Sequence, residues 1–126
     1  MVKSFNYDLS EKGLRAILRD YQEEALRVLW ESKVPLTTKE VWEKVNARRT
    51  EPISRASIIF FLEDMMNAGV LKGDDRTGKG GHYYAYSPSM DEAEFKRFIA
   101  LEVLGSLKKQ FPEETESALK SIVGKD

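Results

Sequence analysis

The stretch from Thr37 to Pro88 places the strongest constraint on the fold, because a boundary signal stands at nearly every junction within it. Thr37 and Glu40 form a T-x-x-E capping box, in which each side chain satisfies an amide that a new helix leaves free. This box predicts a helix over about residues 38–49. Pro52 then ends the helical run, because the residue before a proline is disfavoured in the helical conformation.

A second helix is predicted from Arg55 to about Ala68. Ser54 is a preferred N-cap residue, and Gly69 supplies the stop after the last turn. Apolar residues recur here at the i, i+3, i+4, i+7 spacing of one helix face: Ile58, Phe61, Leu62 and Met65. Hydrophobic pairs also flank both helix starts and fix the angle at which the chain joins each helix: Leu36 with Val41, and Ile53 with Ile58.

A β-hairpin is predicted after the second helix. Two β-prone runs, residues 70–72 and 82–86, bracket a glycine-rich loop over residues 73–81. Helix, turn, helix and hairpin in this order are typical of a winged helix-turn-helix, in which the hairpin is the wing. The predicted fold class is therefore mainly α, with a small β-hairpin wing and additional helices after it.

The N-terminal side of this unit is predicted to be helical as well. Asp20 and Glu23 have capping-box spacing, so we expect a helix from Asp20 to about Ser32 that forms the first helix of the domain. Trp30 on this helix is interpreted as a core residue. Residues 1–19 are an N-terminal helical extension, with a short helix through Arg19 that docks on the domain or on a partner subunit.

The C-terminal region, residues 89–126, is predicted to form two helices. Ser89 and Glu92 make a third capping box for a helix to about Gln110, and Pro112 opens a last helix. The apolar positions cover more than one face, which requires burial on two sides. We expect homodimerisation through Phe95, Phe98, Ile99, Val103, Leu107, Leu119 and Ile122. The alternative is that both helices fold back onto their own domain, residues 20–88.

Composition excludes several classes of function. At 126 residues the chain is one domain, or one domain with an oligomerisation extension. It has no cysteine, which excludes disulfides, thiolate catalysis and cysteine-ligated metals. His82 is the single histidine and Gly78–Gly81 lacks phosphate-loop spacing, so we predict no enzyme activity, no cofactor and no metal site. No membrane span or signal peptide is visible, and a cytoplasmic location is expected.

Several stretches together resemble the winged-helix transcriptional repressors of the penicillinase-repressor family. They span about residues 20–110 and comprise Glu24–Glu31, Leu36–Val41, Ser57–Leu62, Ala68–Lys72 and Tyr83–Pro88. The resemblance implies a homodimer that binds double-stranded DNA at a palindromic operator and dimerises through its C-terminal helices. Members are inactivated by proteolysis at an Asn-Phe bond in those helices or by copper at a cysteine cluster. No asparagine follows Ser89 and the chain has no cysteine, so neither device is present; a small-molecule effector stays unknown.

The predicted DNA-binding residues come from three places. The second helix of a helix-turn-helix enters the major groove by its N-terminal half, which carries Ser54, Arg55, Ala56, Ser57 and Phe60. The end of the preceding helix carries Arg48 and Arg49, whose alternative is a solvated basic helix end. The wing carries Lys72, Arg76, Lys79 and His82, whose alternative is a solvated loop of mixed charge.

Two observations oppose the DNA hypothesis. The net charge is −1, from 20 basic and 21 acidic residues, so the chain has no overall basic field. Glu63 and Asp64 are also expected on the outward side of the second helix, where phosphates would repel them. The alternative function is therefore a winged-helix module that binds protein in a transcription or chromatin assembly.

Overall fold

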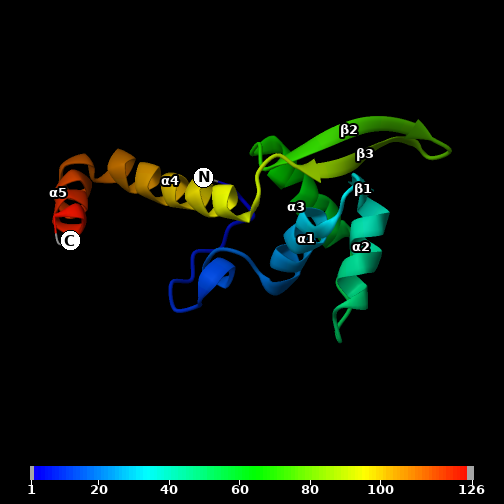
Figure 1. Ribbon diagram of the computed structural model, residues 1–126, viewed down its shortest axis with the longest axis horizontal. Helices are drawn as coiled ribbons and strands as arrows, with labels where there is room; N and C mark the ends of the chain where they lie inside the picture. The colour runs from blue at the N-terminus through cyan, green and yellow to red at the C-terminus, as the bar shows by residue number, and fades with distance from the viewer. Residues whose placement is uncertain (1, 125–126) are drawn as a thin grey trace.

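The structure is a computed structural model that describes residues 2–124 (Figure 1). Along the described chain, one 3-10 turn, η1 (Gly13–Ala16), precedes the first helix. The other elements follow in this order: α1 (Asp20–Glu31), β1 (Leu36–Thr37), α2 (Thr38–Ala47), α3 (Arg55–Asn67), β2 (Leu71–Gly78), β3 (Gly81–Pro88), α4 (Glu92–Gln110) and α5 (Pro112–Val123). The three strands form one antiparallel sheet in the order β1-β3-β2. This is a winged helix, as the sequence predicts.

The two central helix starts are confirmed. Thr37 Oγ1 accepts the Glu40 amide at 3.2 Å, and Glu40 Oε1 accepts the Thr37 amide at 2.9 Å. That amide also holds the pKa of the Glu40 carboxyl below its ordinary value. Ser54 Oγ accepts the Ser57 amide at 3.1 Å and begins α3. The four apolar residues of the predicted α3 stripe are all buried in the core.

The wing, residues 71–88, is longer than predicted. Gly78 pairs with Gly81, which leaves only Lys79 and Gly80 as the turn between two eight-residue strands. The expected loop over residues 73–81 is therefore wrong for residues 73–78, which continue the ladder of β2. Loop-forming residue types misled the prediction, because cross-strand pairing with the tyrosine-rich β3 outweighs the low strand propensity of glycine and aspartate.

The helix α1 begins at Asp20 as predicted, but the N-cap residues predicted for α1 and α4 are wrong by one and two residues. The cap of α1 is Arg19, whose amide donates to Gln22 Oε1 at 2.8 Å, whereas Asp20 is already helical. The cap of α4 is Asp91, which exchanges hydrogen bonds with Glu94, so the Ser89 box does not form. Instead the Ser89 amide donates to the Val70 carbonyl at 2.9 Å, so Ser89 still belongs to the base of the wing.

The N-terminal residues are part of the same core. Phe5, Leu14, Ile17 and Leu18 are buried against the helices of the winged domain. Only Gly13–Ala16 is helical, as a 3-10 turn, so the predicted helix through Arg19 is wrong beyond that turn. The docking of this region on the domain, one of the two expectations, is what the structure shows.

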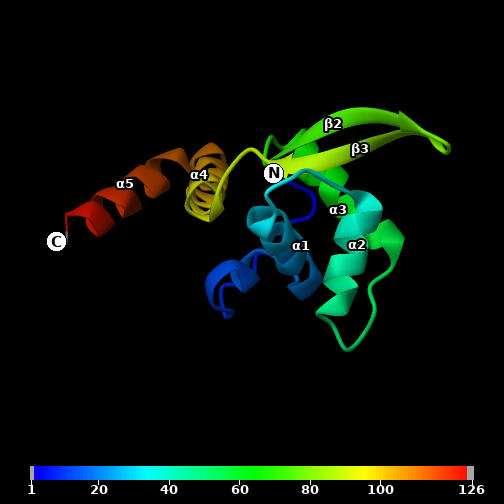
Figure 2. The same ribbon diagram turned by 45° about the vertical axis from the view of Figure 1, so that its right-hand side comes forward.

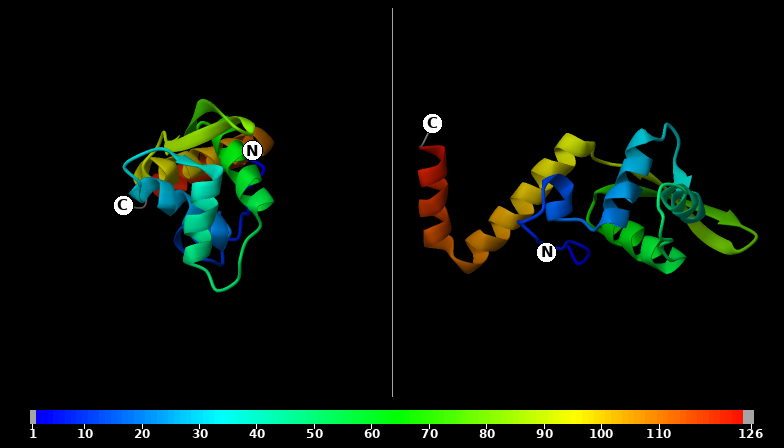
Figure 3. Two further views of the ribbon diagram at one scale, coloured as in Figure 1. Left: turned by 90° about the vertical axis from the view of Figure 1, so that its right-hand side faces the viewer. Right: turned by 90° about the horizontal axis from the view of Figure 1, so that it is seen from below.

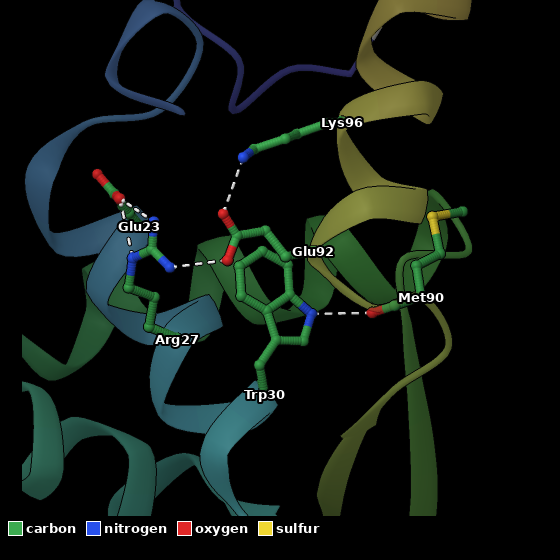
Figure 4. A network of polar contacts seen from close by, with 6 residues as sticks. All are labelled: Glu23, Arg27, Trp30, Met90, Glu92 and Lys96. Atoms are coloured by element: carbon green, nitrogen blue, oxygen red, sulfur yellow. Dashed lines mark hydrogen bonds and ion pairs between the residues drawn. The ribbon is translucent and has the colours of Figure 1, made fainter. Parts of the chain in front are cut away.

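A polar network joins α1 to the beginning of α4 (Figure 4). The indole nitrogen of Trp30 donates to the Met90 carbonyl at 2.8 Å. Arg27 bridges Glu23 on its own helix at 2.7 Å and Glu92 on α4 at 2.9 Å, and Lys96 also pairs with Glu92. Beyond this joint α4 leaves the domain and α5 crosses its far end, opposite the wing tip (Figures 1 and 3). None of the helices over residues 2–124 is long and apolar enough to cross a membrane.

Candidate nucleic-acid interface

The turn between α2 and α3 is held by two side chains of α2. Asn46 Oδ1 accepts the Ile53 amide at 2.8 Å, and Asn46 Nδ2 donates to the Ile53 carbonyl at 3.3 Å. The indole of Trp42 donates to the same carbonyl at 2.8 Å. Because every polar group of the Ile53 backbone is engaged, the next residue, Ser54, is fixed in position and so is the start of α3.

The start of α3 offers donors and positive charge to an anion. Ser54 and Ser57 bond each other through their hydroxyls at 2.9 Å, and Arg55 beside them is exposed. Arg55 has no ion-pair partner among residues 2–124. The positive end of the helix dipole adds to its charge.

The exposed face of α3 is apolar at its centre. Phe60 is 77% exposed and Ile59 is 36% exposed, with Ala56 one turn before Phe60 and Glu63 one turn after it. The sequence prediction named Ala56 and Phe60 but missed Ile59. The signal was present, since Ile59 lies outside the i, i+3, i+4, i+7 stripe that faces the core.

Arg48 and Arg49 are engaged within the domain. Arg48 pairs with Glu31 at 2.5 Å, at the end of α1. Arg49 is 13% exposed at its side chain and pairs with Asp20 at 3.1 Å and Glu24 at 3.8 Å. Burial raises the pKa of Asp20, but hydrogen bonds from Arg49 and the Tyr21 amide outweigh it and hold that pKa below its ordinary value. Much of the charge of both arginines is therefore compensated.

The wing carries four of the predicted residues, and two of these are paired. Arg76 contacts Asp74 and His82 contacts Asp75, each at 3.2 Å. Lys79 lies in the two-residue turn at the tip, and Lys72 lies near the base of β2. Neither lysine has an ion-pair partner within the described chain. Over residues 2–124, the chain thus offers three uncompensated cations from the predicted set: Arg55, Lys72 and Lys79.

The wing and α3 share one end of the molecule. The tip of the wing projects past α2 on the side where the chain enters α3, as Figure 2 and the left panel of Figure 3 show. The α2–α3 connection that follows Arg48 and Arg49 lies at the opposite end of α2 from the wing. Since Arg48 and Arg49 also pair with acids of α1, the uncompensated Arg55, Lys72 and Lys79 are the candidate DNA-binding cations.

Asp64 and Glu63 differ in their surroundings. Asp64 is half-buried, and its Oδ2 accepts the backbone amide of Ser4 at 2.8 Å, so it faces the N-terminal residues. Glu63 is exposed.

An open groove of about 820 Å³ lies beside Asp64, between residues 2–6, the second half of α3 and α4. Over the described range no group of three His, Cys, Asp or Glu side chains could hold a metal ion.

The predicted dimerisation residues fall into two groups. Phe95 and Ile99 are buried in the chain's own core, and Phe98 and Val103 pack partly against it. Of the later residues, Leu107 and Ile122 are 41% and 67% exposed, and Leu119 is half-buried. They belong to a C-terminal arm, residues 100–123, whose other exposed large apolar side chains are Leu101, Leu104, Phe111 and Val123. The first half of α4 thus folds back onto its own domain, whereas the arm has an unpartnered apolar surface.

Residues 18–125 match a family model described as the penicillinase repressor, so the match covers α1 to α5 and the whole wing. It begins after residues 2–17, which pack on the domain from outside the matched range. No curated relative matches the chain.

Proposed function

Since the chain belongs to the penicillinase-repressor family, whose members are DNA-binding transcriptional repressors rather than enzymes, we propose that it represses transcription as a homodimer on a palindromic operator. The observation that carries this proposal is the exposed, uncompensated Arg55 at the start of α3, beside a wing whose tip carries Lys79. The two recognition helices of the dimer read half-sites about 10 bp apart. Its place of action is the cytoplasm, where the operator lies.

The residues of α3 fall into two groups: those proposed to contact base edges and those proposed to contact the DNA backbone. Arg55 binds a guanine edge or a phosphate, and the hydroxyls of Ser54 and Ser57 bind phosphate. Ala56, Ile59 and Phe60 form an apolar surface that suits the methyl groups of thymine. Glu63 is an acceptor for the cytosine amino group at the far end of this row.

Dimerisation is proposed through the C-terminal arm. Its apolar side chains are exposed on both α4 and α5, and covering them by a second copy removes them from water. Phe95, Phe98 and Ile99 contribute to this dimer indirectly, because they pack the first turns of α4 against the winged domain. The inducing signal is not assigned, since the cysteine cluster and the Asn-Phe cleavage site of the family resemblance are missing here.

The test measures binding to DNA directly. An operator is selected from a random duplex pool, and fluorescence anisotropy then follows binding at ~150 mM salt against excess random duplex. Repression on an operator requires a competitor-resistant Kd near ~10⁻⁸ M, while non-specific binding lies at about 10⁻⁴ to 10⁻⁶ M. The duplex upstream of the protein's own coding region is included, because a repressor of its own synthesis binds there.

One observation favours a second function, a module that binds protein. Phe60 and Ile59 expose apolar surface beside the acidic Glu63, and such a surface also suits a protein partner. If neither the selected pool nor the upstream duplex binds above the non-specific level, this second function replaces the first.

A further inference from the structure

Residues 2–7, which we call the N-terminal strap, connect α3, the proposed recognition helix, to the first turns of α4. The amide of Ser4 donates to Asp64 Oδ2 on α3 at 2.8 Å. The carbonyl of the same residue accepts from Gln22 Nε2 on α1 at 3.3 Å, and Gln22 is itself buried. The backbone of Ser4 is therefore held between two helices of the winged domain.

The next residue of the strap holds α4. Phe5 is 8% exposed, and its ring lies edge-on to Phe95 at 6.0 Å and to Phe98 at 6.4 Å between ring centres. Both partners lie in the first two turns of α4. Aromatic pairs of this geometry stabilise beyond their buried area. Ser4 of the strap thus contacts α3, and its neighbour Phe5 contacts the first turns of α4.

The strap also explains an acid on the recognition helix. Phosphates near this helix would repel a carboxylate, so another role has to account for Asp64. Asp64 accepts a backbone amide in a charge-assisted hydrogen bond, which is stronger than one between neutral groups. The donor lies in residues 2–17, outside the part of the chain that matches the family. Asp64 itself lies inside that part, so the strap adds a contact to the matched domain from outside it.

The joint that this addition reinforces is small. Apart from the strap, α4 is connected to the winged domain by the Trp30–Met90 hydrogen bond and the exposed Arg27–Glu92 pair (Figure 4). Its apolar contacts there come from the buried Phe95 and Ile99 and the partly buried Phe98 and Val103. Because a dimer through the C-terminal arm places each recognition helix by way of α4, the angle at this joint decides how far apart the two recognition helices lie.

We propose that the N-terminal strap sets the spacing of the DNA half-sites, with Asp64 and the Ser4 amide as positioning groups that do not touch DNA. This inference rests on the proposed dimeric operator binding. Two linked sites gain affinity only when the linkage matches their separation, so a loosened joint lowers the gain from the second half-site and leaves the first unchanged.

The experiment compares variants on two kinds of duplex, one with a single half-site and one with paired half-sites whose separation runs from about 8 to 13 bp around the expected helical turn. Ser4→Pro removes the donor amide, and Ser4→Ala is its matched control because the amide stays. Asp64→Ala removes the acceptor, and Asp64→Asn is its control because it keeps an oxygen while losing the charge. Each affinity for paired sites is divided by that for the single site, which cancels the effect of charge on DNA binding.

Wild type and both controls are expected to prefer one separation. Ser4→Pro and Asp64→Ala are expected to lose about tenfold in the paired-to-single ratio and to accept neighbouring separations almost equally. An unchanged ratio and preference in both variants overturns the inference, as does an equal loss on single and paired sites, which would mean that the strap only stabilises α3. A wild type without any preference for paired sites overturns the dimer proposal first, and this inference with it.

Discussion

At the scale of single residues, Arg55 is the side chain that we propose reads DNA. Its guanidinium is exposed at the start of α3 and unpaired among residues 2–124, whereas Arg48 is held by Glu31. We expect Arg55→Ala to weaken binding to the selected operator by about 1–3 kcal/mol and to relax the preference at one base pair.

The control for this prediction is Arg48→Ala, which removes the same charge from a residue that is already paired. Anisotropy with operator variants at each base position measures both effects. If Arg48→Ala weakened operator binding more than Arg55→Ala, the DNA surface would lie nearer the end of α2 than the structure indicates.

Gly73 in β2 is closely packed against the side chains of Met66 and Tyr84. A Cβ at this position would lie 2.3 Å from Met66 Sδ and 3.1 Å from the ring of Tyr84, so Met66 has to move. We expect Gly73→Ala to lower the free energy of unfolding by about 1–2 kcal/mol, as overpacking does elsewhere. Gly80→Ala in the wing turn is the matched control, since its Cβ meets nothing within 4 Å. Urea unfolding measures the stability of both variants. Equal stabilities of Gly73→Ala and Gly80→Ala would contradict the close packing at Gly73.

At the scale of elements, the joint between α1 and α4 depends on pH. Lys96 and then Arg27 hold the pKa of the Glu92 carboxyl below its ordinary value. A folded-state pKa below the unfolded one stabilises the native state above the unfolded pKa, and this contribution disappears as pH falls through the folded value. We therefore expect the stability difference between wild type and Glu92→Gln to shrink as pH falls from about 6 to about 3.

Unfolding in urea at several pH values measures this difference. The exposed pair contributes little in absolute terms, so the direction of the change is the result to examine. Lys39→Ala, which breaks another exposed helix pair, Lys39–Glu43, away from α4, is a suitable comparison. A stability difference that grew on acidification would contradict the role assigned to Glu92.

The elements also show what a sequence can predict. The starts of α2 and α3 were correct, because a single cap candidate stands before each. The N-caps predicted for α1 and α4 were wrong, because contacts with distant residues decide them: Gln22 reaches Ser4, and the amide of Ser89 donates to the Val70 carbonyl. In the site, Arg55 could be placed from helix periodicity alone. The engagement of Arg49 by α1 and of Asp64 by the strap could not, since both depend on residues more than 20 positions away.

At the scale of the whole molecule, the few uncompensated cations limit the salt dependence of DNA binding. Three cations in each protomer give about six phosphate contacts in a dimer, and hence a slope near −5 for log K against log salt concentration. We expect Lys79→Ala to weaken binding to all duplexes alike and to make this slope less steep by about 2 per dimer. Titrations of DNA binding between about 50 and about 250 mM salt measure the slope. An unchanged slope would mean that the wing tip stays away from the backbone.

We propose that the oligomeric state depends on the C-terminal arm. Ile122 is 67% exposed on α5, and a charge placed there would have to be buried in the proposed dimer. We expect Ile122→Glu to shift the sedimentation coefficient from that of a dimer to that of a monomer. Leu9→Glu is the control, because Leu9 is 85% exposed on the N-terminal region and its substitution should leave the dimer intact. Dimers of equal stability in both variants would refute an interface on α5.

The projection of α4 from the domain has a mechanical consequence. A helix of 19 residues is about 28 Å long, so a tilt of about 10° at its base displaces its far end by about 5 Å. This displacement exceeds the rise of one base pair, about 3.4 Å. The helix therefore acts as a lever that magnifies small movements of its fulcrum. Any ligand, protease or partner that disturbed the few contacts at the fulcrum would misplace the second recognition helix without touching either DNA or the arm.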